Sequence, residues 1–227
     1  MDSSYLLYAA LKYGAKVKAY HAKTQFQPEF ELKDARCMAE YLGADMLVLE
    51  MDILAHQQVV SNPADRCYHC KKAIFSELQK QAMSDGFTLI IDGTNASDDA
   101  EDRPGMMATK ELSVRSPLRE CGITKDEVRR LSKEAGLFTW DKPSYACLAT
   151  RIPTGRGYTA ELLEKVEQSE DALRELGFTD FRVRVMGDAA KLQLPHDQMG
   201  KAIIEKSAII NAIKPHFKAI LLDLEGR

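Results

Sequence analysis

Apolar positions along this chain alternate between stretches of helical period and short runs rich in β-branched residues. In the N-terminal part the pattern predicts helices over 3–12, 30–42, 62–86 and 124–135. Between them it predicts strands over 17–22, 45–51, 87–91 and 114–118. Strands that alternate with helices indicate a parallel sheet covered by helices on both faces.

Local signals define several of these helix ends. Gly14 and Gly43 end the first two helices, and Thr124 with Glu127 three residues later forms a capping-box pattern. Asn62 before Pro63 predicts the start of the third helix, with Asn62 as its cap. Ligands of parallel sheets bind beyond the carboxyl ends of the strands, so Thr24 and residues 92–95 lie where chemistry is expected.

A different pattern begins after residue 136. Residues 137–158 have the composition of a loop, with Trp140, prolines, glycines and Cys147. The pattern then predicts, in order, a helix over 159–176, strands over 181–185 and 190–194, a helix over 198–213 and a strand over 217–224. The fold class expected is α/β, with a parallel-sheet domain over 1–156 and a smaller α+β domain over 157–227.

Composition narrows the function classes. The 227 residues carry a net charge of −3 with 29% charged residues, which argues against a general nucleic-acid binder, since such proteins present a basic face. The chain has neither a secretory leader nor an apolar run near the roughly 18 residues of a membrane span, so no membrane partner is expected. Five scattered cysteines do not suggest a disulfide framework, and we expect a reducing, cytoplasmic environment.

The stretch Cys67-Tyr68-His69-Cys70 places two thiols on one face of the third predicted helix, near its N-terminus. The positive end of a helix favours thiolates there. A single C-x-x-C is compatible with a redox pair, half of a zinc site or two inert thiols. Cys37, within a predicted helix, is expected to be a buried small apolar residue. The role of Cys121 is left open.

Several short motifs, taken together, point to one family. Met1-Asp2-Ser3-Ser4 before a helix resembles the end of the S-G-G-x-D-S loop of PP-loop ATP pyrophosphatases, in which backbone and helix N-terminus cradle an anion. Further motifs match in order and spacing: Asp92-Gly93-Thr94-Asn95, Asp98, Arg103-Pro104-Gly105, Ser116-Pro117-Leu118, Trp140-Asp141-Lys142-Pro143, Cys147 to Pro153, and Arg182-Val183-Arg184. The set resembles the LarE family, ATP-dependent sulfur transferases of nickel-pincer nucleotide biosynthesis.

The resemblance implies an adenylylating enzyme. ATP would activate a carboxylate of pyridinium-3,5-biscarboxylic acid mononucleotide, and a sulfur nucleophile would displace AMP to leave a thiocarboxylate. Asp2 and Ser3 would contact pyrophosphate, and Gly93 and Thr94 would help to bind ATP. By position alone, Ala22 and Thr24 at a strand end would face adenine. Asp98 fits a Mg²⁺ ligand, and its acidic neighbours Asp99, Glu101 and Asp102 match the family less well.

The family resemblance also implies a role for three of the cysteines. One branch sacrifices a cysteine of the loop that corresponds to residues 144–151, and another holds a 4Fe-4S cluster on three cysteines. Cys67, Cys70 and Cys147 match the second branch, with one iron open to carry sulfide. These three residues are therefore our expected catalytic residues and cluster ligands.

A phosphate site is expected in the C-terminal part. Arg182 and Arg184 alternate along a predicted strand and so face the same side. With Arg151 they would capture the substrate phosphate, because guanidinium groups bind phosphate in bidentate fashion. A solvated strand face is the alternative. Glu170 is a weaker candidate for the same substrate site.

The chain also departs from the family pattern. It begins after the position of the loop glycines and the first strand, and it stops at Arg227, so we expect a chain truncated at both ends. A homo-oligomer is expected, and no sulfur donor is indicated. Two alternatives stay open: a PP-loop tRNA thiolase, and a degenerate protein that binds nucleotide or metal without turnover.

Overall fold

The computed structural model describes residues 1–98 and 104–227, which form two compact units. Unit 1 comprises Met1–Thr24, Glu29–Ile53 and Ala64–Lys142. Unit 2 comprises Gln25–Pro28, Leu54–Pro63 and Pro143–Arg227. Residues 143–156 group with the C-terminal residues in this division, and the predicted domains 1–156 and 157–227 stay a prediction.

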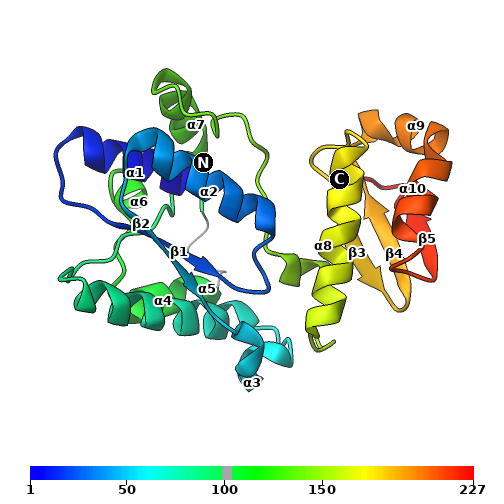
Figure 1. The fold of residues 1–227 in the computed structure, drawn as a ribbon, viewed down its shortest axis with the longest axis horizontal. Coiled ribbons are helices and arrows are strands. Elements are labelled where there is room, and N and C mark those ends of the chain that lie inside the picture. Colours follow the sequence, from blue (N-terminus) through cyan, green and yellow to red (C-terminus); the bar gives the residue numbers. More distant parts are fainter. Residues whose placement is uncertain (99–103) are drawn as a thin grey trace. The chain divides into compact units, whose positions relative to one another are not determined.

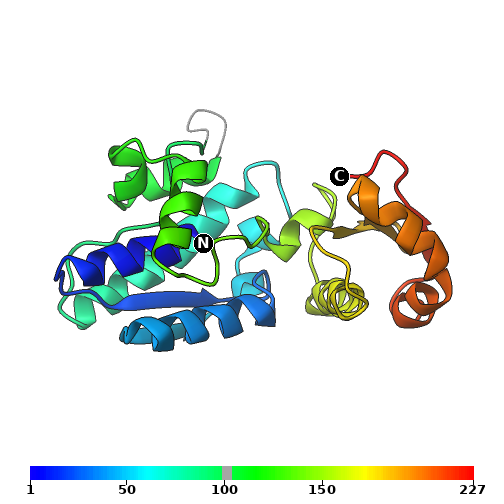
Figure 2. The same cartoon turned by 90° about the horizontal axis from the view of Figure 1, so that it is seen from above.

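Unit 1 is an α/β unit with a parallel strand pair (Figure 1). Its elements are α1 (Asp2–Lys12), β1 (Ala19–Lys23), α2 (Glu29–Leu42), β2 (Met46–Glu50), α4 (Arg66–Ser84), α5 (Pro104–Glu111), α6 (Pro117–Glu120) and α7 (Lys125–Glu134). Strands β1 and β2 pair in parallel from Ala19 opposite Met46. Helix α2 contacts β1 and runs along it (Figure 2).

The predicted helix ends of unit 1 are largely confirmed. Gly14 and Gly43 follow α1 and α2 with φ of +76° and +61°, a conformation that glycine adopts without strain. The capping box of α7 is present: Thr124 Oγ1 accepts from the backbone N of Glu127, and Glu127 Oε2 accepts from the backbone N of Thr124. Leu6 of α1 packs with Leu118 and Val128, which joins α1, α6 and α7 in one core.

Two predictions for unit 1 are wrong. Segments 87–91 and 114–118 are not regular strands; they meet in one parallel bridge between Ile91 and Arg115, and Pro117 already begins α6. Helix α4 begins at Arg66, with Asp65 and not Asn62 at its N-cap position. Asn62 adopts a left-handed φ of +53°, and its amide donates to the carbonyls of Pro153 and Arg156. These two contacts hold the Asn62 side chain against other residues of unit 2.

Unit 2 contains a three-stranded sheet in the order β3-β4-β5. Its elements are η1 (Ile53–Ala55, which spans the boundary of the units), α3 (Gln57–Val60), η2 (Leu148–Arg151), α8 (Ala160–Glu175), β3 (Arg182–Met186), β4 (Ala189–Gln193), α9 (His196–Ile204), α10 (Lys206–Ile213) and β5 (Ala219–Leu222). Strands β3 and β4 form an antiparallel hairpin, and β4 and β5 pair in parallel. Helix α8 contacts both β3 and α10 (Figures 1 and 2).

The predicted helix over 198–213 is instead two helices, α9 and α10, separated at Glu205. Glu205 leaves helical geometry, with φ of −89° and ψ of 14°. Ala202 on α9 and Ile209 and Ile213 on α10 are buried, whereas Ile204 beside the break is 84% exposed. The break lets both segments turn apolar side chains to the core. No helix in residues 1–98 and 104–227 is long and apolar enough to cross a bilayer.

Candidate functional site

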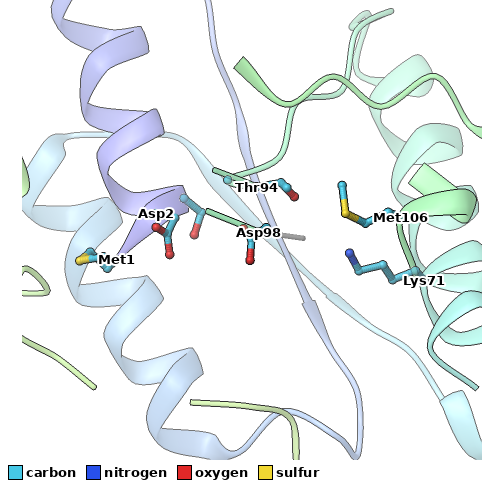
Figure 3. A pocket seen from close by; sticks show the side chains of 8 residues that line it. Met1, Asp2, Lys71, Thr94, Asp98 and Met106 are labelled. Atoms are coloured by element: carbon cyan, nitrogen blue, oxygen red, sulfur yellow. The ribbon is translucent and has the colours of Figure 1, made fainter. Parts of the chain in front are cut away.

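A cavity of about 320 Å³ opens at the N-terminus of α1 in unit 1. The residues that line it come from four segments: the start of the chain (Met1, Asp2, Ser3), the 92–98 loop (Gly93, Thr94, Asp98), α4 (Lys71) and α5 (Met106). Figure 3 shows Asp2, Thr94 and Asp98 on one side, with Lys71 and Met106 opposite. The structure thus brings together Asp2, Ser3, Gly93, Thr94 and Asp98, all of which were predicted to contact ATP or its metal.

Gly93 makes this convergence possible. A Cβ at Gly93 would lie 2.6 Å from the backbone N of Ser3, closer than any side chain tolerates. The 92–95 loop therefore rests directly on the first turn of α1. The first-turn N–H groups of a helix lack intrahelical partners and carry the positive end of its dipole, so the cavity suits an anion.

Charged side chains frame the cavity. Asp2 pairs with Lys125 Nζ at 2.5 Å and accepts from the Asn95 amide at 3.2 Å. Lys71, from α4, supplies a cation on the opposite wall. Its aliphatic stem crosses Gly105, where a Cβ would lie 2.9 Å from Lys71 Cδ. The glycine of the Arg-Pro-Gly motif, Gly105, thus leaves room for the Lys71 side chain to reach the cavity.

Hydrogen bonds fix the 92–98 loop. Asp92 accepts from the backbone N and Oγ1 of Thr94, and from Ser116 Oγ at 2.7 Å. Asp98 accepts from the backbone N of Asn95 at 3.1 Å. The Ser-Pro-Leu motif is therefore tied to the Asp-Gly-Thr-Asn motif through Asp92. Asp99, Glu101, Asp102 and Arg103 lie outside the described residues.

Sequence reasoning missed the place of Lys71 and Met106 in this cavity. The lysine pair after Cys70 was visible, but its helical phase gave no indication of which lysine reaches a cavity. Ala22 lies in β1 and Thr24, which is 3% exposed, follows it; neither lines the cavity, and their contact with adenine stays a prediction.

The predicted cluster ligands lie on two elements. Cys67 and Cys70 are in the first two turns of α4, Cys67 exposed and Cys70 half-buried, and Arg66 Nη2 lies 3.2 Å from Cys67 Sγ. Cys147, half-buried, directly precedes η2 in unit 2. No three His, Cys, Asp or Glu side chains within residues 1–98 and 104–227 already form a metal-binding group. Cys37 is exposed, so its predicted burial is wrong: it lies on the solvent side of α2.

Arg151 and Glu170 occupy the interior of unit 2. Arg151 Nε donates to Glu170 Oε1 at 2.7 Å and Nη2 donates to Oε2 at 3.1 Å. Nη1 of Arg151 donates to the carbonyl of Ala146 and to Thr150 Oγ1, each at 2.8 Å. Burial lowers the pKa of Arg151, but its hydrogen bond and charge pairing with Glu170 raise that pKa overall. The guanidinium thus holds the loop that carries Cys147.

Tyr145 completes this interior cluster. Its hydroxyl donates to Glu170 Oε2 at 2.5 Å, and its ring lies 4.6 Å from the guanidinium carbon of Arg151 and 5.3 Å from that of Arg182. Burial, and then the Glu170 charge, raise the pKa of Tyr145, so the hydroxyl stays protonated. Two further arginines contact the same loop: Arg182 donates to the Ser144 carbonyl and Arg184 to that of Thr150.

The two strand arginines differ in exposure. Arg182 is 7% exposed, and burial followed by the Arg151 charge lowers its pKa to about 10. Arg184 is exposed and also donates to Gln193 Oε1. Arg184 is therefore the predicted phosphate ligand that solvent reaches, whereas Arg151 has a side chain that is 0% exposed.

Comparison with known proteins shows related sequences across the whole chain, although no protein-family model matches it. An uncharacterized protein of Synechocystis sp. is 37% identical over 199 residues, which cover 86% of this chain and 74% of that protein. The pyridinium-3,5-bisthiocarboxylic acid mononucleotide synthase of Lactiplantibacillus plantarum is 31% identical over 229 residues, which cover 100% of this chain and 83% of that enzyme.

More distant relatives match a smaller part of the chain. The tRNA-specific 2-thiouridylase MnmA of Thermotoga maritima is 26% identical over 183 residues, or 60% of this chain and 50% of that protein. A solved structure from Methanocaldococcus jannaschii, a predicted subunit of tRNA methyltransferase, covers 60% of this chain and 83% of its own at 18% identity. Its TM-score of 0.34 is too low to carry an argument.

Proposed function

Because the chain belongs to the LarE family of ATP-dependent sulfur transferases, we propose that it acts in the biosynthesis of the nickel-pincer cofactor. Its substrate would be pyridinium-3,5-biscarboxylic acid mononucleotide, and its product a thiocarboxylate of that nucleotide. The observation that carries this proposal is the 31% identity to the Lactiplantibacillus plantarum synthase over the full chain. The charged cavity at the N-terminus of α1 supports it, because adenylylation requires a phosphate cradle.

The first step activates the substrate. A carboxylate oxygen attacks the α-phosphorus of ATP, a P–O bond forms, and pyrophosphate leaves. Ser3 and the first turn of α1 would hold the phosphates, and Lys71 would offset their charge from the opposite wall. Asp2 and Asp98 line the same cavity and would bind the Mg²⁺ that accompanies ATP.

The second step transfers sulfur. A sulfur nucleophile attacks the carbonyl carbon of the acyl adenylate, a C–S bond forms, and AMP leaves with the electrons of the C–O bond. Cys67, Cys70 and Cys147 would hold a 4Fe-4S cluster, which supplies sulfide when it is bound. Their donor chemistry fits, since all three are thiols with some exposure and two lie in the first turns of one helix. A sacrificial Cys147 and a zinc pair at Cys67 and Cys70 are the alternatives.

The C-terminal unit would hold the substrate phosphate. Exposed Arg184 would contact it directly, and Arg182, which is 7% exposed, would contribute from beneath it. Arg151 and Glu170, buried and paired, would position the Cys147 loop. Self-association of the chain stays a prediction.

Matched lysine variants test the activating step. Lys71→Ala should reduce pyrophosphate release from ATP and the substrate at least tenfold, since it removes the cation that faces the cradle. Lys72→Ala is the control: the neighbouring lysine pairs with Glu111 at 2.9 Å and does not line the cavity. Equal activity of both variants would contradict the cavity assignment, and absence of pyrophosphate release from wild type would contradict the function.

Matched cysteine variants test the sulfur-transfer step. After anaerobic reconstitution, iron and acid-labile sulfide should be retained by Cys37→Ser and Cys121→Ser and lost by Cys67→Ser, Cys70→Ser and Cys147→Ser. Retention of iron by the last three would exclude the cluster. Loss of 34 Da from Cys147 during turnover would identify the sacrificial route instead, because a cysteine that leaves dehydroalanine loses H₂S (about 34 Da by its chemistry).

The similarity to 2-thiouridylase keeps tRNA as a second candidate substrate. A net charge of −3 argues against it, because phosphate-backbone binding relies on clustered cations. Binding of tRNA that weakens steeply between 50 and 200 mM salt, about a thousandfold for six contacts, would favour this candidate.

A further inference from the structure

A second hollow, of about 500 Å³, lies within unit 2 at one end of its sheet. Four cations line it: Arg156, Lys165, Lys214 and Lys218. Leu162 and Phe217 add apolar surface. We call this hollow the basic pocket. It forms where the β3–β4 turn, the first turns of α8 and the loop between α10 and β5 meet (Figure 1).

Positive charge is in excess in the basic pocket, although the chain as a whole carries −3. The one carboxylate among its lining residues is Asp188, which pairs with Lys218 at 2.7 Å. Lys165 pairs with Glu161, which is 76% exposed, at 2.6 Å. The Lys218 ammonium holds the pKa of Asp188 below its usual value, and the charges of Arg156 and Lys165 act in the same direction. Within residues 1–98 and 104–227, these four cations form ion pairs with two carboxylates, Asp188 and Glu161.

The frame of the basic pocket is built by main-chain contacts. Arg156 Nη1 donates to the Gly187 carbonyl at 2.8 Å, and the backbone N of Lys218 donates to the Asp188 carbonyl at 2.9 Å. Thr159 caps α8 by accepting from the backbone N of Leu162 at 3.1 Å. The capped N-terminus of this 16-residue helix adds its dipole to the side-chain charges. Phe217, 5% exposed, fixes the position of the loop before β5.

We propose that the basic pocket binds a phosphomonoester that carries an apolar or aromatic group, with its phosphate on the lysines and its apolar part against Leu162 and Phe217. Its lining residues are all different from those of the cavity of unit 1. The basic pocket is also separate from the start of β3, since Arg182 and Met186 are the two ends of that strand, about 13 Å apart at the usual rise per residue. A phosphate bound by Arg182 and Arg184 therefore leaves the basic pocket free for a second phosphorylated ligand.

Phenyl phosphate is the probe. In a ¹⁵N-TROSY titration of the full chain, the amides of Leu162, Gly187, Asp188 and Lys218 should shift together and define one dissociation constant. Lys165→Gln combined with Lys214→Gln should raise that constant at least tenfold. Lys80→Gln combined with Lys206→Gln removes the same charge from exposed positions elsewhere and should leave it unchanged.

Two further titrations measure the contributions of the phosphate and of the apolar group to binding. Phenol should cause little shift at these amides, and inorganic phosphate should bind several-fold more weakly than phenyl phosphate. The proposal is overturned if the four amides do not shift, if the pocket variant binds as tightly as the control, or if phenol acts as phenyl phosphate does. If inorganic phosphate binds as tightly as phenyl phosphate, the proposed contact of the ligand's apolar group with Leu162 and Phe217 is overturned. The thermal midpoint of both variants, compared with wild type, shows whether they fold.

Discussion

Arg151 and Glu170 form an ion pair in which the two side chains are 0% and 1% exposed, with Nε 2.7 Å from Oε1. Glu170 also accepts from the Tyr145 hydroxyl and from the backbone N of Val183 at 2.9 Å. One carboxylate thus satisfies a guanidinium, a phenol and an N–H group of edge strand β3. Burial makes this pair costly to break, because each group left alone would lack both water and partner.

Glu170→Gln should therefore destabilise the protein strongly. The amide keeps the shape but removes the charge that compensates Arg151, and breaking a buried pair typically costs about 3–5 kcal/mol. For a chain of this size the thermal midpoint should fall by about 10 °C. Glu164→Gln on the exposed side of the same helix is the control, and its midpoint should stay within about 1 °C of wild type. Equal midpoints for both variants would show that the buried pair contributes nothing.

Tyr145→Phe should loosen the Cys147 loop with less loss of stability. The variant loses one hydrogen bond to Glu170, worth about 1–3 kcal/mol because the acceptor is charged, and keeps the ring between the two arginines. Alkylation of half-buried Cys147, followed by peptide mapping, should become several-fold faster. Exposed Cys37 and Cys121 serve as internal references, and their rates should not change. An unchanged Cys147 rate would mean that the hydroxyl does not restrain the loop.

The sequence predicted elements well where local chemistry decides them. The capping box at Thr124 and the glycines after α1 and α2 are short-range signals, and the structure has helix ends there. It failed at Asn62, because a cap residue before proline looks the same whether its amide caps a helix or, as here, binds carbonyls more than 90 residues away. The break at Glu205 was missed for a related reason: burial of both α9 and α10 depends on the core they cover.

In the candidate site, too, short motifs were predicted correctly and contacts between distant residues were missed. Asp2, Gly93 and Thr94 were identified through their motifs, and the structure places them on one cavity. Lys71 was missed since its role depends on Gly105, 34 positions later, leaving space for its stem. The burial of Arg151 could not be read from a pattern that equally suits a surface phosphate ligand, because its partner Glu170 lies on another element.

His21 should make stability depend on pH. Its Nε2 is buried and finds no hydrogen-bond partner in the described part of the chain, and burial, followed by the charges of Lys23 and Arg36, lowers its pKa. The unfolded chain then binds a proton near pH 6.5 that the folded chain does not, so the contribution is present above that pH and is lost as pH falls toward the folded pKa.

Urea unfolding at pH 7.5 and 5.5 tests this dependence. The free energy of unfolding should fall on acidification in wild type, and by clearly less in His21→Phe, which has no proton to bind. His56→Gln, at an exposed histidine, should retain the wild-type difference. If His21→Phe loses as much stability as wild type between the two pH values, other groups carry the dependence.

Gly93→Ala should weaken ATP binding much more than it weakens the fold. Its Cβ would meet the Ser3 backbone N at 2.6 Å, and neither the loop nor the first turn of α1 can yield without changing the cavity. We expect ATP binding, measured by calorimetry, to weaken at least tenfold, with a stability loss of about 1–3 kcal/mol from overpacking. The matched control is Gly200→Ala in α9, because its Cβ would meet nothing within 4 Å and alanine favours a helix. This control should bind ATP as wild type does and be slightly more stable. If only Gly93→Ala binds ATP more weakly, the contact between the loop and α1 is the cause. Unchanged ATP binding in Gly93→Ala would mean that this contact does not shape the site.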